Sequence, residues 1–345
     1  MAQLTIKDIA KICNVGVTTV SRAINNEPGI SEATKERIMK VVHEYNYVPN
    51  NSARNLKMIE SNTIALLVIG IENTFFTSML GPFEDELRKR GYDFLLHAVS
   101  WDQDEVTVAT ELMKEKRLKG IILLGGQMKR VNERMDALGI PYVLCTVAND
   151  STYSSLDCPW VGIDDEMEAY NAVNYLISKG HKDIALIAGH KQGDAVCGHR
   201  YEGYKRALKE HGIKENPDLV HFAKEDSTDF SLENGYNGTR ALLKTKAHFT
   251  AMFCMSDLIA VGAYKAFNEA NIRIPQDCSV IGFDGIDLSY YMSPGLTTMY
   301  QPRVEMVVHS VKMLIDKLED GVKADKKLYM ATLIERESVA ELETK

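Results

Sequence analysis

The sequence predicts a small all-helical segment followed by a much longer α/β unit. The chain has 345 residues, which is more than one hydrophobic core usually supports. Residues 5–56 show short runs of helical periodicity, whereas apolar strand-like runs alternate with amphipathic stretches from Thr63 onward. Such alternation is typical of parallel sheets with helices on both faces. About ten expected strands are too many for one compact sheet of this kind, so we expect two similar subdomains.

The charge distribution divides the chain at the same place. Residues 1–58 carry eight Lys or Arg against five Asp or Glu, within a protein whose net charge is −8. A basic head on an acidic body suits a protein that holds phosphates at one end only. The acidic balance of the whole chain does not exclude nucleic acid, because the field that matters is local.

The N-terminal segment reads as three short helices. Thr5 and Asp8 have the spacing of a capping box for the first helix, and the second spans Val17 to about Ile24. Ser31 is a suitable N-cap for a third helix that extends to about Tyr45. The expected core stripes contain Ile6, Ile9, Ala10, Cys13, Val20, Ala23, Ile24, Ile38, Val41, Val42 and Tyr45.

The second helix leaves a small polar surface with one arginine facing outward. Val17, Thr18, Ser21 and Arg22 form this surface, and the turn-prone residues 14–16 separate the helix from the first one. Two short helices joined in this way are the layout of a helix-turn-helix. Spacing alone leaves the assignment open, since many helical bundles carry an arginine on a surface helix.

The order of the residues is more specific than their spacing. The motifs are Thr5–Ala10, Val15–Asn25, Gly29–Ser31, Asn46–Asn50 and Ala53 followed by Leu56. In these motifs the chain resembles the lactose/galactose repressor family of bacterial transcription factors, and the similarity continues through nearly its whole length. The resemblance implies a DNA-binding headpiece at 1–48, a hinge helix and linker at 49–61, and an effector-binding core at 62–345.

The resemblance also implies a function and a set of DNA contacts. The chain would be a homodimeric repressor, not an enzyme, on near-palindromic double-stranded operator DNA. Val17 and Thr18 would read base edges, Arg22 could pair with guanine, and Leu56 would be a wedge in the minor groove. The expected backbone contacts are Thr5, Thr19, Ser21, Asn25, Asn50 and either Arg54 or Asn55, with Ala53 beside the wedge. Read without the family, residues 50–58 could equally be an ordinary linker, because they are too few for a stable helix in water.

The α/β unit contains a regular series of expected elements. The expected strands are Ile64–Ile69, Phe94–Val99, Gly120–Leu124, Tyr142–Thr146, Val161–Ile163, Ile184–Ala188, Leu219–Phe222, Ala251–Cys254, Ser279–Phe283 and Leu328–Leu333. The expected helices are Phe83–Arg90, Glu105–Lys116, Glu166–Ser178, Tyr201–His211, Leu232–Leu243, Leu258–Ala270 and Arg303–Glu319. The resemblance implies two lobes of periplasmic-binding-protein type with three crossovers. The N-lobe would span about 62–160 and 292–323, and the C-lobe about 161–291 and 324–340.

Parallel α/β sheets bind ligands beyond the carboxyl ends of their strands. This rule and the family resemblance together select Asn73, Phe76, Thr146, Arg200, Ser256, Asp257, Asp284 and Gln301 as candidate effector contacts. The Arg200 fork can donate to two adjacent hydroxyls, and Asp284 can accept from them. Acidic candidates outnumber the one arginine, which favours a neutral sugar or polyol over a sugar phosphate or sugar acid.

Several of these candidates have plainer interpretations. Arg200 could be a salt-bridge partner that closes the lobes, and Asp257 could cap the helix that follows it. Asp164 and Asp165 are expected to cap their own following helix. Trp160 could pack between lobes or present a ring face to a ligand, and Trp101 could also present a ring face. Relatives often carry Asp and Asn where Thr146 and Ser256 stand, so no single relative's ligand transfers to this chain.

The remaining motifs exclude other classes of protein. Glycine-rich nucleotide-binding motifs and the Gly-x-Ser-x-Gly motif are absent. The six cysteines are scattered without a Cys-x-x-Cys pair, so we expect no metal site and no cofactor. With no signal-like N-terminus and no run of about 20 apolar residues, we expect a cytoplasmic protein that joins the nucleoid on its operator. A transport-binding protein would lack residues 1–58, and a protein co-regulator stays an alternative or additional partner.

Overall fold

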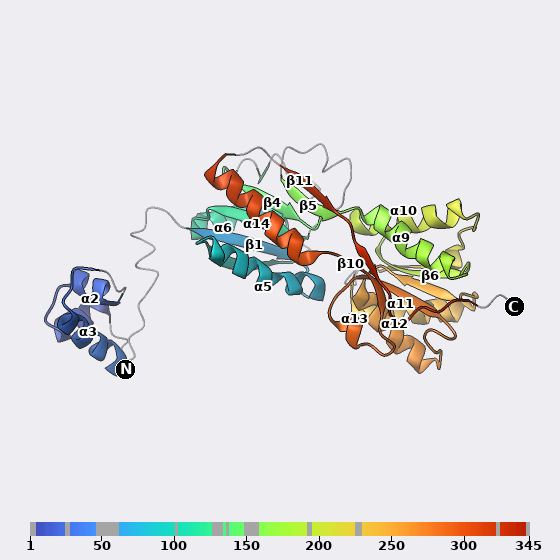
Figure 1. Ribbon diagram of the computed structural model, residues 1–345, viewed down its shortest axis with the longest axis horizontal. Helices are drawn as coiled ribbons and strands as arrows, with labels where there is room; N and C mark the ends of the chain where they lie inside the picture. The colour runs from blue at the N-terminus through green and yellow to red at the C-terminus, as the bar shows by residue number, and fades with distance from the viewer. Residues whose placement is uncertain are drawn as a thin grey trace. The chain divides into compact units, whose positions relative to one another are not determined.

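The computed structural model describes residues 5–24, 28–45, 62–100, 103–125, 134–135, 138–147, 159–191, 195–224, 230–321 and 325–342. The chain divides into two compact units, Met1–Ser61 and Asn62–Lys345 (Figure 1). The described residues do not include six positions that the sequence predicts to be functional: Asn25, Asn50, Ala53, Arg54, Leu56 and Trp101.

The described residues of the smaller unit form three helices: α1 (Ile6–Ile12), α2 (Val17–Ile24) and α3 (Glu32–Glu44). Their core consists of Ile9, Ala10, Cys13, Val20, Ala23, Ile38 and Val42. The Thr5 N–H donates to the Asp8 carboxylate at 2.9 Å, and Ser31 Oγ accepts from the Thr34 N–H at 3.3 Å. These contacts confirm the two helix starts. The placement of Tyr45 on the core stripe was wrong, because α3 ends before it and its side chain is 48% exposed.

Two six-stranded sheets form the framework of the larger unit. Sheet A has the order β11-β5-β4-β3-β1-β2, and sheet B has the order β12-β10-β9-β8-β6-β7. All neighbouring strands are parallel except β10 and β12. The strands are β1 (Thr63–Ile69), β2 (Asp93–Val99), β3 (Gly120–Leu124), β4 (Tyr142–Cys145), β5 (Trp160–Ile163), β6 (Ile184–His190), β7 (Val220–Ala223), β8 (Ala251–Cys254), β9 (Ser279–Asp284), β10 (Thr297–Tyr300), β11 (Lys326–Tyr329) and β12 (Thr332–Ile334).

Helices cover both faces of each sheet. Where the structure describes the larger unit, its helices are α5 (Thr74–Lys89), α6 (Glu105–Lys116), α9 (Asp165–Ser178), α10 (Ala195–Glu210), α11 (Leu232–Thr245), α12 (Asp257–Glu269), α13 (Leu288–Tyr291) and α14 (Arg303–Glu319), with a 3-10 turn η1 (Pro217–Leu219). Figure 1 shows α5 and α14 along sheet A, and α9 and α10 across sheet B from α11 and α12.

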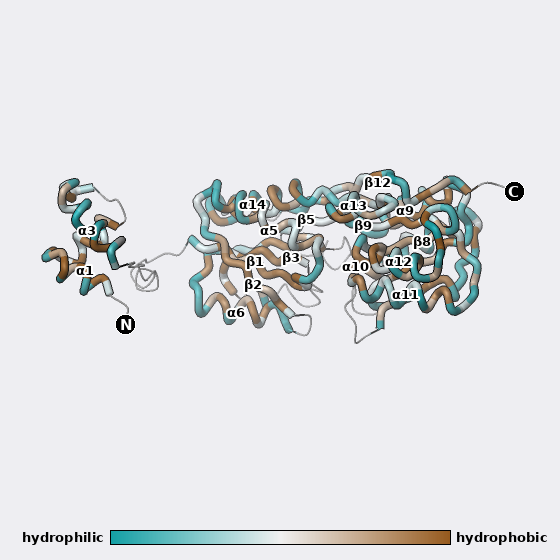
Figure 2. The backbone as a smooth tube through the Cα atoms, turned by 90° about the horizontal axis from the view of Figure 1, so that it is seen from below, coloured by the Kyte–Doolittle hydropathy of each residue, from teal (hydrophilic) through white to brown (hydrophobic). Residues whose placement is uncertain are grey.

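Alternation along β1 explains the two faces of sheet A, because successive side chains of a strand point to opposite sides. Ile64, Leu66 and Val68 share a core cluster with apolar residues of α5 and α14. Ala65, Leu67 and Ile69 belong instead to a second cluster with α6. Figure 2 shows β1 and β3 as strongly apolar segments, as expected for strands buried on both faces.

The chain passes between the sheets three times, after β5, after β10 and between β11 and β12. The apolar run expected as one strand, Leu328–Leu333, is two strands in different sheets, because the chain crosses at Met330 and Ala331. The expected lobe boundaries differ from the sheets in the same way. Residues 161–163 and 326–329 lie in sheet A, and residues 297–300 lie in sheet B. An apolar run in the sequence predicts a strand, but it does not indicate in which of the two sheets that strand will lie.

Two helices beside the strand ends begin earlier than the expected helices did. Asn73 caps α5 by accepting from the Phe75 N–H at 3.0 Å, so the helix starts nine residues before Phe83 and contains Pro82. Similarly, α10 begins at Ala195 rather than at Tyr201. Both earlier turns carry residues of the site described below.

Gly203 marks a close contact between α10 and α9. A Cβ at Gly203 would lie 2.1 Å from the Glu166 carbonyl oxygen and 2.8 Å from the Tyr170 nitrogen. Gly203→Ala is therefore expected to lower the free energy of unfolding by about 1–3 kcal/mol or more through overpacking. Chemical denaturation of the whole chain measures the change.

Gly198 supplies the matched control in the same helix, because no heavy atom lies within 4 Å of a Cβ built there. Gly198→Ala should raise the free energy of unfolding by about 0.5–1 kcal/mol, as expected for replacing glycine inside a helix. Equal effects of the two substitutions would contradict the close contact at Gly203.

Candidate functional site

The exposed surface of α2 is the first candidate site. Val17, Thr18 and Arg22 are exposed on this helix, while Thr19 and Ser21 are half-buried. Val20 and Ala23 occupy the core, which fixes the rotation of the helix and leaves the predicted base-reading residues at the surface. The turn before α2 contains Asn14 with φ 50°, a conformation that Asn adopts more readily than most residues. The geometry is that of the second helix of a helix-turn-helix.

The second candidate site is a cavity in the larger unit with a volume of about 390 Å³. This volume is typical of small-molecule sites. Residues from both sheets contribute, and most of them follow the carboxyl ends of strands. The lining consists of Gly70, Glu72, Asn73, Thr74, Phe75, Phe76, Gly125, Thr146, Val147, Ile163, Asp165, Val196, Arg200, Phe230, Ser231, Leu232, Glu233, Leu258, Asp284 and Gln301.

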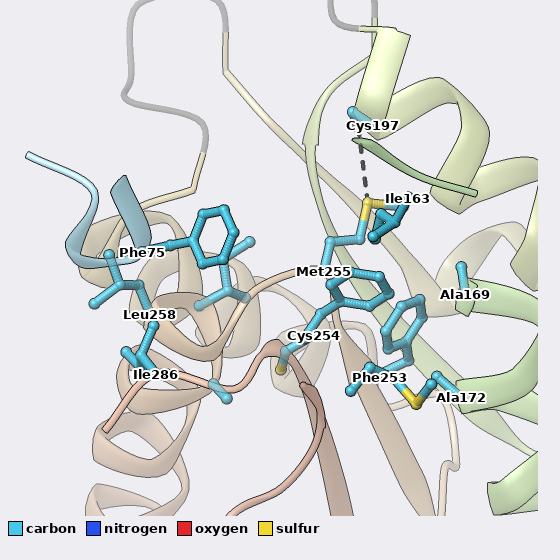
Figure 3. Packing of buried hydrophobic residues seen from close by; sticks show 14 of the residues in the cluster. Phe75, Ile163, Ala169, Ala172, Cys197, Phe253, Cys254, Met255, Leu258 and Ile286 are labelled. Atoms are coloured by element: carbon cyan, nitrogen blue, oxygen red, sulfur yellow. Dashed lines mark hydrogen bonds between the residues drawn. The ribbon is translucent and has the colours of Figure 1, made fainter. Parts of the chain in front are cut away.

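The start of α5 places two phenylalanine rings in the cavity. The Asn73 cap begins the helix, so Phe75 and Phe76 lie in its first turn. Gly125, with φ 73°, allows the Phe76 ring to approach, since a Cβ there would lie 2.8 Å from a ring carbon. Figure 3 shows Phe75 from α5 and Leu258 from α12, both of which line the cavity. It also shows the Cys197 thiol beside Met255, with 3.8 Å between the sulfur atoms.

Arg200 of α10 is buried and tied to three elements. Its Nε donates to Asp165 Oδ1 at 2.9 Å, and its Nη1 donates to the Met255 carbonyl oxygen at 2.5 Å. Nη1 also lies 3.7 Å from Asp284 Oδ1, and the guanidinium lies 3.7 Å from the centre of the Phe283 ring. Arg200 is therefore a salt-bridge residue that also lines the cavity, and its contact with a ligand stays a prediction.

Asp284 ends β9 in the left-handed region, with φ 108°. Its Oδ1 accepts from Gln301 Nε2 at 2.8 Å. Burial raises the pKa of Asp284 to about 7, although the Arg200 charge and the Gln301 hydrogen bond act in the opposite direction. A carboxyl group with this pKa can change charge near neutral pH and can accept hydrogen bonds from ligand hydroxyls when it is ionised.

Six of the eight predicted effector contacts line the cavity: Asn73, Phe76, Thr146, Arg200, Asp284 and Gln301. The other two are fully buried elsewhere. Ser256 caps α12 by accepting from the Ile259 N–H at 3.2 Å. Asp257 accepts from the Ile286 N–H at 2.8 Å and from the Thr298 hydroxyl at 2.6 Å. Burial, followed by the Asp284 charge, raises the pKa of Asp257 to about 8.

Neighbouring acidic residues separate into different roles. Asp164 caps α9 as expected, accepting from the Met167 N–H at 3.0 Å, whereas Asp165 lines the cavity and holds Arg200. Trp160 is 4% exposed and is absent from the cavity lining, so it packs in the core of sheet A.

Sequence reasoning missed the contribution of the segment before and within the first turn of α11. Phe230, Ser231, Leu232 and Glu233 line the cavity, although they follow no strand directly. Ser231 caps α11 by accepting from the Asn234 N–H at 3.1 Å. The Ser-x-x-Asn spacing indicates a helix start, but nothing in it indicates a ligand site.

Comparison with known proteins finds matches in both units of the chain. Residues 5–50 match the family described as bacterial regulatory proteins, lacI family, and residues 173–339 match a periplasmic binding protein-like domain. The HTH-type transcriptional regulator MalR of Clostridium butyricum is 35% identical over 337 residues, covering 97% of this chain and 99% of MalR. This chain belongs to the LacI family. The ribose operon repressor of Haemophilus influenzae is 33% identical over 339 residues, covering 98% of this chain and 99% of its own length.

Solved structures of transcriptional regulators share the fold. The transcriptional regulator CelR–cellobiose complex has a TM-score of 0.71 at 26% identity, and covers 97% of this chain and 100% of that one. A LacI family regulator from Enterococcus faecium with bound ribose has a TM-score of 0.70 at 29% identity, and covers 81% of this chain and 100% of that one.

The LacI-family chain is thus a DNA-binding transcriptional repressor with an effector-binding domain, and its relatives are regulators rather than enzymes. No helix in the described part of the chain is long and apolar enough to cross a membrane. The described residues also contain no group of three His, Cys, Asp or Glu side chains that could hold a metal ion.

The pKa of Asp284 gives a pH-dependent prediction. Its folded-state pKa of about 7 lies above its ordinary value of 3.8, so folding favours the protonated form. The resulting stabilisation is present below about pH 4 and is lost as the pH rises through about 7. Asp284→Asn should therefore gain melting temperature relative to the unmodified chain between pH 5 and 8, measured by circular dichroism without ligand.

Asp277 provides the control for this comparison. It is an exposed carboxylate whose pKa is lowered to about 2, chiefly by hydrogen bonds from Arg273. Its contribution is lost only as the pH falls through the range of about 4 to 2, so Asp277→Asn should leave the trend between pH 5 and 8 unchanged. A constant offset between Asp284→Asn and the unmodified chain would contradict the raised pKa of Asp284.

Proposed function

We propose that this LacI-family chain is a homodimeric repressor whose operator affinity is controlled by a neutral sugar or related polyol. The observation that carries the proposal is the cavity, in which Arg200, Asp284 and Gln301 form a connected set of hydrogen-bonding groups beside Phe75 and Phe76. Hydroxyl groups can both donate to and accept from such a set, and ring faces of a sugar can pack on aromatic side chains.

The charge of the cavity supports a neutral effector over an anionic one. The positive charge of Arg200 is offset by Asp165 at 2.9 Å and by Asp284 at 3.7 Å. Glu72 and Glu233 add acidic groups to the lining. An anion such as a sugar phosphate would meet more negative than positive charge. The neighbours that carry cellobiose and ribose are consistent with a sugar effector for this chain as well.

The proposed response links the cavity to the headpiece through the crossovers. Asp165 lies two residues after the end of β5, and Gln301 directly follows β10, so two cavity residues belong to segments that pass between the sheets. An effector that contacts both would favour one arrangement of the sheets over another. That preference would bias the hinge at residues 50–56 between folded and unfolded forms, with a coupling free energy of about 1–3 kcal/mol.

The proposed DNA interface combines base reading and positioning. Val17, Thr18 and Arg22 would reach base edges in the major groove, with Thr5, Thr19, Ser21, Asn25, Asn50 and Arg54 on the backbone and Ala53 and Leu56 at the minor groove. The support is the exposure of Val17, Thr18 and Arg22 on α2. Homodimerisation would place two headpieces on a near-palindrome. The neighbouring Tyr290 and Tyr291, which are 67% and 77% exposed, offer an apolar surface for self-association.

Arg200→Lys tests the effector site. The lysine keeps a positive charge beside Asp165 and Asp284 but loses the planar fork that donates to several acceptors at once. The effect of a stabilising sugar on operator affinity should fall at least tenfold, with operator affinity in its absence unchanged. Fluorescence anisotropy on an operator selected from random DNA measures both quantities.

The matched control is Arg206→Lys, which alters an arginine on the solvent side of the same helix. Its ion pairs with Glu210 and Glu166 are surface contacts, so the sugar response should persist. A full response in Arg200→Lys would move the effector site away from this cavity.

Leu56→Ala tests the proposed wedge. Removing the apolar side chain should weaken binding to the selected operator while leaving affinity for random DNA nearly unchanged, because phosphate contacts carry nonspecific binding.

Arg22→Ala should reduce the free energy of operator binding by about 1–3 kcal/mol and relax specificity at one base position. Equal losses on operator and random DNA would refute the wedge for Leu56 and would identify Arg22 as a phosphate contact.

A further inference from the structure

The chain enters the larger unit between two turns that follow helices. Residues 46–61 lead from the end of the smaller unit to Asn62, whose carbonyl oxygen accepts from the Asp93 N–H at 3.0 Å. The next carbonyl oxygen, that of Thr63, accepts from the Lys119 N–H at 2.8 Å. Asp93 follows the turn that ends α5, and Lys119 lies in the turn between α6 and β3. The start of β1 is therefore bound to the turns at the ends of both helices.

Both helix ends carry exposed cations, and Figure 2 shows the two helices on either side of β1. The cations of α5 are Arg88, Lys89 and Arg90, which form ion pairs with Glu84 and Glu86. The cations of α6, called the basic edge, are Lys114, Lys116 and Arg117. The basic edge forms no ion pair with any residue that the structure describes, so its positive charge is available to a partner.

Cations in the last turn of a helix have a plainer role, because they stabilise the negative end of the helix dipole. That role applies equally to Lys244 and Lys246 at the end of α11 in the other half of the larger unit. The position of the basic edge is what differs. Residues 59–345 contain 32 Lys or Arg against 43 Asp or Glu, yet three unpaired cations gather where the DNA-binding unit is attached.

We propose that the basic edge is a second, sequence-independent contact surface for DNA, which binds backbone phosphates of the duplex held by the headpiece. Residues 46–61 span at most about 60 Å even when fully extended, so a duplex on the headpiece is held near the larger unit. This tether makes the second contact intramolecular, and even weak binding then adds to the affinity. Salt screens charges beyond about 8 Å at physiological ionic strength, so the basic edge acts on phosphates that come close.

The test compares the triple variant Lys114→Gln, Lys116→Gln, Arg117→Gln with the unmodified full chain by fluorescence anisotropy. Glutamine is a good helix former, so α6 should persist, and circular dichroism checks the fold. Affinities for the selected operator and for random DNA of the same length should fall by the same factor, about fivefold or more at about 0.1 M salt, because phosphate contacts carry no sequence information. The slope of log affinity against log salt concentration should become shallower by about 1 or more, since each phosphate contact contributes about 0.9.

The matched control is the triple variant Lys209→Gln, Lys244→Gln, Lys246→Gln. It removes the same charge from exposed positions of α10 and α11, and Lys246 shares the left-handed conformation of Arg117. This control should leave both affinities and the salt slope unchanged. Equal losses in the two triple variants would assign the effect to net charge and overturn the proposal, and so would the absence of a loss in both. A loss on the operator alone would also overturn it, because phosphate binding affects random DNA as well.

Glu115→Gln tests the same surface in the opposite direction without removing a cation. Glu115 is exposed between Lys114 and Lys116, so its neutralisation makes the basic edge more positive. Affinity for both DNAs should rise about twofold or more at about 0.1 M salt, through stronger attraction of phosphates. An unchanged or lower affinity in Glu115→Gln would refute the second contact surface, whether or not the triple variant folds.

Discussion

The buried guanidinium of Arg200 is the interaction on which the effector-binding unit depends. It connects Asp165 after β5, the Met255 carbonyl oxygen after β8 and Asp284 at the end of β9, while packing on the Phe283 ring. Removing the charge would leave two buried carboxylates without a cation, which typically costs about 3–5 kcal/mol. The same side chain lines the cavity, so a ligand that binds it acts on the contacts that hold three strand ends together.

Each of the three segments that cross between the sheets is held by a hydrogen-bonded carboxyl group. Asp165 begins the first and is held by Arg200, and Gln301 begins the second and is held by Asp284. At the third, Glu168 of α9 accepts from the Ala331 N–H at 2.9 Å, and burial raises the pKa of this carboxyl. Each segment between the sheets is thus tied by a carboxyl group, two of which line the cavity. A small ligand in the cavity can therefore contact two of these carboxyl groups. Through them it can act on the segments that must move if the sheets reorient.

Much of this organisation follows from the sequence, because strand alternation and the rule for parallel sheets depend only on local pattern. The helix starts at α5 and α10 did not follow, since the expected helices began only at Phe83 and Tyr201. Pro82 lies inside α5, and Gly198 faces open space, so neither ends its helix. Ser256 and Asp257 follow β8 as the rule requires, yet helix α12 begins at once and buries both. The residues at the start of α11 were not predicted to line the cavity, because their position there depends on tertiary packing alone.

Two residues that line the cavity have strained backbone conformations. Thr146 after β4 and Asp284 at the end of β9 have φ of 62° and 108°, and such conformations cost about 1–3 kcal/mol each in residues other than glycine. Each is held by its neighbours: the Thr146 N–H donates to the Val161 carbonyl oxygen at 2.8 Å, and the Asp284 carbonyl oxygen accepts from the Gln301 N–H at 3.2 Å. At Thr146 the hydroxyl is bound by the backbone, and at Asp284 the carboxyl group meets Gln301 and Arg200. The same kind of strained residue therefore presents a backbone-bound hydroxyl at the end of a strand in sheet A and a carboxyl group that meets Arg200 and Gln301 at the end of a strand in sheet B.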